Sequence, residues 1–409
     1  MLQRIWLGFF VIAFFSSLYQ WWFLGDSEVY ARMVKASFDM ASLSVELALG
    51  LIGVMSLWLG IVALGEASGW IGKLGNALSP LFTRLMPGIP KGHPAISSMS
   101  LNLSANVLGL DNAATPLGLK AMQDLQTLNP NKETASNAQI LFLVLNTSSV
   151  TLFPITVLLY RAQLGAEDPA SIFIPILIAT SCSTLAGLLV TAWVQRIKLW
   201  DGVVLGYLGL GFGLILALVA YFSTLGVAEL QQQSSLISNF LIFALIMFFL
   251  VSAHIKQVDV YSTFIDGAKQ GFDVAIKIIP FLLAMLVAIG IFRASGALDI
   301  LLEGIRNIVI TFNGDTRFVD AMPTALMKPL SGSGSRAMMV ETMNTFGVDS
   351  FQGYLAATMQ GATETTFYVL AVYFGSVGIR YGRHALACGL VADTAGITAA
   401  IGVAYWFYG

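Results

Sequence analysis

The sequence contains few charged residues. Asp, Glu, Lys and Arg make up 11% of its 409 positions, against about 25% in a typical soluble domain. A water-soluble surface of this size needs more charge, so a large soluble domain is excluded. The 21 basic and 23 acidic residues nearly balance, for a net charge of −2. We therefore expect no basic surface and no nucleic-acid partner.

Cysteine and histidine are also scarce. Cys182 and Cys388 form no CxxC pair and lie in apolar segments, so they predict neither a disulfide nor a metal site. The three histidines lie at expected helix ends beside basic residues. Neither an HExxH motif nor a GxxxxGK[ST] phosphate loop occurs. We expect no enzymatic activity and no cofactor, and the sequence leaves metal binding open.

Long apolar runs take the place of the missing charge. Hydrophobic residues make up 56% of the chain, and several runs approach or exceed the roughly 18–20 residues that cross a bilayer as a helix. The first run is too long for a signal peptide and ends in interfacial aromatic residues. These features predict an all-α polytopic membrane protein with spans near 5–24, 43–64, 172–194, 203–222 and 236–253.

Short motifs recur in the same order in the two halves of the chain. Ala67-Ser68-Gly69 matches Ala294-Ser295-Gly296, and each precedes apolar residues at helical spacing, which predicts amphipathic helices along the membrane interface. Near the end of each half, Thr184–Gly187 matches Asp393–Gly396. We interpret this order as an internal duplication. The expected repeats cover residues 1–198 and 230–409, and a linking transmembrane helix lies in 199–229.

Each half also contains two polar interruptions of its apolar chain. Those at 111–116 and 331–336 have arms too short to span a bilayer, so each predicts the tip of a re-entrant helical hairpin. Those at 146–149 and 360–366 predict a broken transmembrane helix in each half. Irregular backbone at membrane depth persists only against protein or a water-filled cavity. We therefore expect the four interruptions to meet.

The distribution of basic residues predicts an orientation in the inner membrane. It places the N-terminus in the cytoplasm and the C-terminus on the periplasmic or extracellular side. The helix expected over 202–224 has no counterpart in the second half, so it inverts that half relative to the first. Inverted repeats with broken helices are typical of secondary transporters, whose binding sites lie between the repeats near the bilayer midplane.

The candidate solute- or ion-binding residues lie in and beside the interruptions. A carboxylate at membrane depth marks an ion or substrate site. Asp111 could instead cap a helix, and Glu364 could pair with Lys328 or Arg336, two cations that could alternatively hold an anionic solute. For Asn106, Asn112 and Asn146, hydrogen bonding between helices is the alternative. The other candidates are hydroxyls and one further amide: Thr115, Thr147, Ser148, Ser149, Ser331, Ser333, Ser335, Gln360, Thr363 and Thr365.

Three segments resemble known membrane proteins. Residues 106–122, which contain Leu-Gly-Leu-Asp-Asn-Ala-Ala-Thr-Pro, resemble spore maturation protein A. Residues 328–336 and 360–378 resemble spore maturation protein B, so the chain looks like a fusion of the two. Both are similar to the nucleoside recognition, or Gate, domain, and distantly to concentrative nucleoside transporters. The resemblance implies a transporter-like core of paired hairpins and broken helices, and it identifies no substrate.

Together these features predict a secondary transporter. We expect it to move a small polar or charged solute across the inner membrane by alternating access, with Na⁺ or H⁺ as the coupling ion. Its expected partners are the lipid bilayer and the solute, and self-association into a homo-oligomer is left open. The alternative is a non-transporting membrane scaffold or regulator of envelope or spore maturation.

Overall fold

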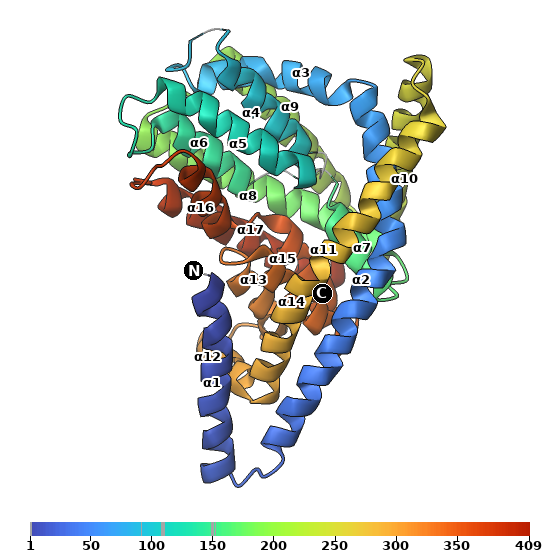
Figure 1. Ribbon diagram of the computed structural model, residues 1–409, viewed down its shortest axis with the longest axis vertical. Coiled ribbons are helices and arrows are strands. Elements are labelled where there is room, and N and C mark those ends of the chain that lie inside the picture. Colours follow the sequence, from blue (N-terminus) through green and yellow to red (C-terminus); the bar gives the residue numbers. More distant parts are fainter. Residues whose placement is uncertain (1, 91, 108–110, 149–150, 152) are drawn as a thin grey trace.

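The computed structural model describes the chain except for residues 1, 91, 108–110, 149–150 and 152 (Figure 1). Within this part, the ordered elements are helices, as predicted. The first half contains α1 (Leu2–Phe23), α2 (Val29–Ala67), α3 (Trp70–Leu85), α4 (Pro94–Val107), α5 (Asp111–Leu128), α6 (Asn137–Thr147), α7 (Ile155–Gln163), η1 (Pro169–Ile172) and α8 (Phe173–Gln195). After α9 (Gly202–Phe222), the second half contains α10 (Val227–Ile255), α11 (Val260–Ala294), α12 (Ala297–Thr311), η2 (Val319–Ala321), α13 (Met322–Met327), α14 (Gly332–Phe346), α15 (Phe351–Ala362), α16 (Thr366–Ser376) and α17 (Ala385–Tyr408).

Among the described residues, six helices are long and apolar enough to cross a membrane: α1, α2, α8, α9, α10 and α17. The end of α11 and α12 form a seventh candidate, bent by 69°. Four of the five predicted apolar runs fall within these spans, and the first, 5–24, extends one residue past the end of α1. The predicted crossings at 136–160 and 350–378 are each a pair of short helices, α6 with α7 and α15 with α16. The protein is therefore a multi-pass membrane protein.

The repeated Ala-Ser-Gly motif forms the same turn in both halves. Gly69 and Gly296 have φ angles of 78° and 71°, in the left-handed region that glycine adopts without steric cost. Their backbone N–H groups donate to Glu66 and Arg293 at 2.9 and 2.8 Å. Each turn ends a long helix, α2 or α11, and directs the chain into an amphipathic helix, α3 or α12.

Helices at matching positions in the two halves pack against each other in antiparallel pairs. In the α2–α11 pair, a Cβ atom on Gly271 would lie 2.5 Å from the Cα atom of Ser56, so this close approach requires glycine. In the α8–α17 pair, Ser183 donates to the Ala392 carbonyl at 2.9 Å, and the Gln195 and His384 side chains meet 3.0 Å apart. Antiparallel pairing of matching helices is what an inverted second half requires. The orientation of the two halves relative to a membrane stays a prediction.

Burial separates the helices that surround the interruptions from those that face outward. In α6, every residue from Gln139 to Thr147 is buried, whereas in α9 only Val204 and Phe222 are. The outward side chains of α9 include Leu210 and Leu216, which are 68% and 66% exposed. A contiguous exposed apolar face of this kind is typical of contact with lipid. The protein core therefore lies around the hairpins and broken helices.

Candidate functional site

The two hairpins are present, but the second arm of each begins closer to the N-terminus than predicted. The segment 111–116 is not an interruption, because α5 begins at Asp111. The segment 331–336 is not one either, because α14 begins at Gly332 and the chain breaks after Met327. Local capping explains the shift at the second tip. The Ser331 hydroxyl accepts a hydrogen bond from the Gly334 N–H at 3.1 Å, which favours a helix start there.

The two broken helices lie where the sequence predicted them, and they are joined through their breaks. The α6 helix ends at Thr147 and α15 ends at Ala362. The backbone N–H of Glu364 donates to the Thr147 carbonyl at 2.7 Å. The N–H of Phe367 donates to the Pro329 carbonyl at 2.9 Å, which connects the second break to the tip of the second hairpin. Backbone groups released by one interruption are thus satisfied by another.

Side-chain amides connect the first hairpin to the broken helix of the first half. The Asn106 side chain donates to the Asn146 side-chain oxygen at 2.8 Å, and Asn146 donates in turn to the Phe142 carbonyl at 2.9 Å. Tyr373 of α16 packs so closely on α5 that a Cβ atom on Gly118 would lie 2.1 Å from its hydroxyl oxygen. The first hairpin therefore contacts the broken helices of both halves.

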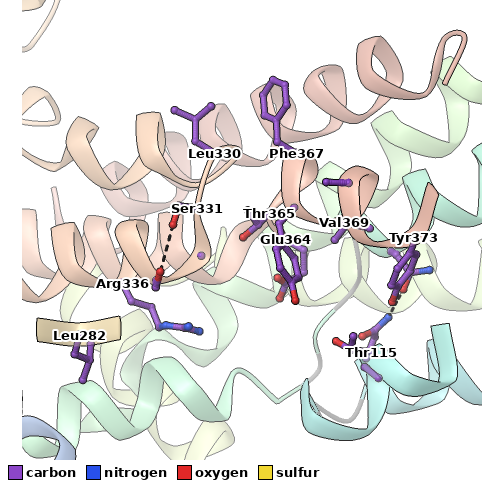
Figure 2. Close-up of a pocket in the computed structure, with 17 residues that line it drawn as sticks. Thr115, Leu282, Leu330, Ser331, Arg336, Glu364, Thr365, Phe367, Val369 and Tyr373 are labelled. Atoms are coloured by element: carbon purple, nitrogen blue, oxygen red, sulfur yellow. Dashed lines mark hydrogen bonds between the residues drawn. The ribbon is translucent and has the colours of Figure 1, made fainter. Parts of the chain in front are cut away.

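A cavity of about 530 Å³ lies where these elements meet. Figure 2 shows Arg336 on one side of Glu364, with Thr115 and Tyr373 on the other. Eight candidate residues line the cavity: Asn106, Thr115, Asn146, Ser331, Ser333, Arg336, Glu364 and Thr365. Its walls offer one cationic and one anionic side chain, two amides and several hydroxyls. Apolar and aromatic residues complete them: Ala114, Leu282, Leu330, Phe367, Tyr368, Val369, Ala371 and Tyr373.

A smaller cavity of about 70 Å³ shares part of this wall. Three further candidates line it: Lys328, Gln360 and Thr363. Arg336 and Glu364 border both cavities. Lys328, Gln360 and Thr363 are 3%, 5% and 3% exposed, so the polar surface of the smaller cavity comes from deeply buried side chains.

The remaining candidates are not brought together as predicted, or lie beyond what the structure describes. Thr147 and Ser148 both donate to the Val144 carbonyl, at 3.0 and 2.8 Å. Ser335 donates to the Thr324 carbonyl at 2.8 Å. These three hydroxyls stabilise local backbone and line neither cavity. The backbone of Asp111 and Asn112 begins α5, their side chains lie outside the described part, and Ser149 lies outside the described residues.

Sequence reasoning missed two polar residues beside the site. Tyr373, a wall residue of the larger cavity, stacks on Phe142 with ring centroids 6.1 Å apart. Asp393 of α17 is 1% exposed and accepts a hydrogen bond from the Thr366 hydroxyl at 2.7 Å. A single carboxylate within the last apolar helix is itself a signal for a functional position.

The two-part organisation also appears in comparison with known proteins. The family model of the Gate domain, described as nucleoside recognition, matches residues 48–163 and again 275–380. The chain belongs to the Gate family. The first match ends in α7 and the second just beyond α16, so each includes a hairpin and a broken helix. The Gate matches therefore include the segments that line the cavity.

Two proteins of Bacillus subtilis (strain 168) are similar to parts of the chain. Spore maturation protein B is 43% identical over 155 residues, which are 38% of this chain and 85% of that protein. Spore maturation protein A is 38% identical over 156 residues, 38% of this chain and 80% of that protein. These matches confirm the resemblance to both proteins. The boundaries at 198 and 230 stay a prediction. No solved structure matches the chain.

Proposed function

We propose that this protein moves a small polar or charged solute across the inner membrane by alternating access. The supporting observation is the convergence of both hairpins and both broken helices on one cavity of about 530 Å³. Cavities of about 300–1,000 Å³ are typical of small-molecule sites. Helix ends at membrane depth are costly unless protein or water satisfies their backbone groups. Those near this cavity hydrogen-bond to one another and border the cavity.

The wall chemistry supports a solute with charge or several hydrogen-bonding groups. Arg336 can hold an anionic group, and Glu364 can hold a cationic group or a coupling ion. Asn106 and Asn146 are already hydrogen-bonded to each other, so their pair can orient a solute from the side of the first hairpin. The antiparallel helix pairs support inverted repeats with this cavity between them. Na⁺ or H⁺ as the coupling ion is part of the proposal.

Transport in proteoliposomes tests the proposal. Radiolabelled uridine, glycine and succinate serve as neutral, zwitterionic and anionic probes, each under an imposed Na⁺ or proton gradient. We expect uptake of at least one probe above that of empty liposomes, and we expect Glu364→Gln to abolish it. Glu303→Gln is the matched control, because Glu303 lies on α12 with its side chain 55% exposed. Equal uptake by Glu364→Gln and wild type would remove Glu364 from the mechanism.

A non-transporting role in envelope or spore maturation is the second candidate. It is favoured by the names of the two Bacillus subtilis relatives, which describe spore maturation rather than transport. A scaffold would tolerate neutral substitutions around the cavity, since its function needs no solute. A maturation phenotype that persists in Glu364→Gln, together with no uptake of any probe, would favour this alternative.

A further inference from the structure

Two opposite charges border the larger cavity without pairing. Arg336 comes from α14 of the second hairpin, and Glu364 from the break between α15 and α16. Figure 2 shows both side chains at the cavity, with no hydrogen bond between them. In the part of the chain that the structure describes, neither side chain makes a hydrogen bond or an ion pair. Charges at membrane depth normally pair with each other or with a ligand.

Other charged side chains in the protein are paired internally. Arg293 of α11 forms an ion pair with Glu341 of α14, and Arg161 pairs with Asp349 at 2.7 Å. Glu341 lies on the same helix as Arg336, so α14 holds one of its charges by contact within the protein and leaves the other facing the cavity. The separation of Arg336 and Glu364 therefore points to a ligand that completes both.

The charges around the two cavities sum to zero. Asp393 interacts electrostatically with Lys328 and with Glu364, and Lys328 borders the smaller cavity together with Arg336 and Glu364. Among the charged side chains that the structure describes here, two cations thus balance two anions. A solute with a net charge would disturb this balance. A solute that carries both signs can instead pair with Arg336 and Glu364 at once.

The rest of the wall suits an apolar group. Three residues of α16, Phe367, Val369 and Tyr373, line the same cavity, and Leu282 and Leu330 join them. Small-molecule sites are mostly apolar, with a few polar groups that fix the orientation of the ligand. The solute should therefore combine its two charges with an apolar part.

We propose that the larger cavity binds a zwitterionic α-amino acid with an apolar side chain. The planar guanidinium of Arg336 holds the carboxylate, and Glu364 accepts hydrogen bonds from the ammonium group. The α16 wall receives the side chain. This assignment names the solute class of the proposed transport function and rests on that function for its role in the cell, whereas binding is measured without transport.

Three ligands with the same aromatic ring test the assignment. Phenylalanine carries both charges, phenethylamine lacks the carboxylate, and phenylpropionate lacks the ammonium group. Scintillation proximity measures the binding of tritiated phenylalanine to the purified full-length protein in NaCl buffer, and its displacement by each analogue. We expect saturable binding of phenylalanine. Each analogue should bind about tenfold or more weakly, because it leaves one charge of the cavity unpaired.

Two variants assign the ends of the ligand. Arg336→Gln should weaken phenylalanine and phenylpropionate by about tenfold or more, without weakening phenethylamine, because only the carboxylate loses its partner. Glu364→Gln should weaken phenylalanine and phenethylamine, without weakening phenylpropionate. The matched controls are Lys269→Gln and Glu303→Gln, whose side chains are 70% and 55% exposed in the wild type.

Size-exclusion chromatography reports the folding of both variants. If either does not fold, the ranking of the three ligands in the wild type carries the test. Absence of saturable phenylalanine binding, or equal affinity of the wild type for all three ligands, would overturn the proposal. Equal weakening of all three ligands in a folded variant would do the same.

The assay also separates this proposal from the transport function. Uptake of uridine or succinate by a protein that does not bind phenylalanine would reject the amino-acid assignment and leave transport intact. Binding of phenylalanine with the expected ranking, but without uptake of phenylalanine or any other probe, would support the site and contradict transport.

Discussion

The two halves of the protein contact each other at both ends of the α8–α17 pair, and these two contacts are built differently. At one end, Tyr408 donates to the Ser171 carbonyl and the Glu167 N–H donates to Asp349, but the main contact is one buried side chain. Arg161 of α7 is fully buried, donates to the Val348 carbonyl at 2.8 Å and pairs with Asp349 at 2.7 Å. We call this contact the buried latch.

The opposite end, where Gln195 meets His384, combines side-chain bonds from Gln126 and Arg383 with three backbone hydrogen bonds. The N–H groups of Arg380 and Tyr381 donate to the Glu133 carbonyl at 2.8 and 3.0 Å. The Ala135 N–H donates back to the Tyr381 carbonyl at 3.0 Å. We call this contact the exposed latch, because its ion pair, Arg380 with Glu133 at 3.5 Å, has side chains 75% and 55% exposed.

The difference shows that a repeated order of elements does not fix how strongly each end is held. The buried latch concentrates its hydrogen bonds and charge in one guanidinium group, which also lies 4.5 Å from the centre of the Tyr354 ring. The exposed latch distributes its bonds over three peptide N–H groups and several side chains, so no single residue carries it. Substitutions should therefore affect the two ends unequally. Under the proposed alternating-access function, we expect these two ends to open in turn.

The largest effect is expected for Arg161→Met. Methionine leaves the Val348 carbonyl without this donor and the Asp349 carboxylate with only the Glu167 N–H. The loss should lower the free energy of unfolding by about 3 kcal/mol, as for other broken buried ion pairs. Unfolding of the detergent-solubilised protein measures it. Arg161→Lys should lie between wild type and Arg161→Met, because lysine keeps the charge without the planar fork. Wild-type stability in Arg161→Met would contradict the importance of the buried latch.

An intermediate effect is expected for Thr184→Val, which compares the matching positions 184 and 393. Valine would leave the Ser148 carbonyl without the Thr184 donor, at a cost of about 1–3 kcal/mol in the free energy of unfolding. The same unfolding assay measures it. Thr394→Val should stay within about 0.5 kcal/mol of wild type, because its side chain is exposed. Equal losses in both variants would show that Thr184 has no special role at the break.

Sequence reasoning succeeded for polar residues in long apolar surroundings. Glu364, Arg336 and Asn146 stand out in the sequence as polar residues within apolar segments, and all three line the larger cavity. The hairpin tips were misplaced because Asp111 and Ser331 were interpreted as part of an interruption. Both residue types favour the start of a helix, and the structure begins a helix at or just after each of them.

The groups that sequence reasoning missed depend on contacts between distant segments. Arg161 follows an apolar stretch and resembles an ordinary interfacial residue, but its partner Asp349 lies 188 positions away. Asp393 is similar, because only the packing of α17 against the end of α15 places Thr363 beside it. Hydropathy and local motifs report neither contact, since both require the relative placement of the two halves.

The smallest effect is expected for Arg380→Ala in the exposed latch. The substitution removes an ion pair between exposed side chains, and such pairs contribute about 0–1 kcal/mol. The three backbone hydrogen bonds to and from Glu133, Ala135 and Tyr381 remain, so the free energy of unfolding should change little in the assay used for Arg161→Met. Added salt should reduce even this small difference, because exposed pairs are screened. A loss as large as that of Arg161→Met would mean that both ends depend on their arginine, and the contrast between the latches would be wrong.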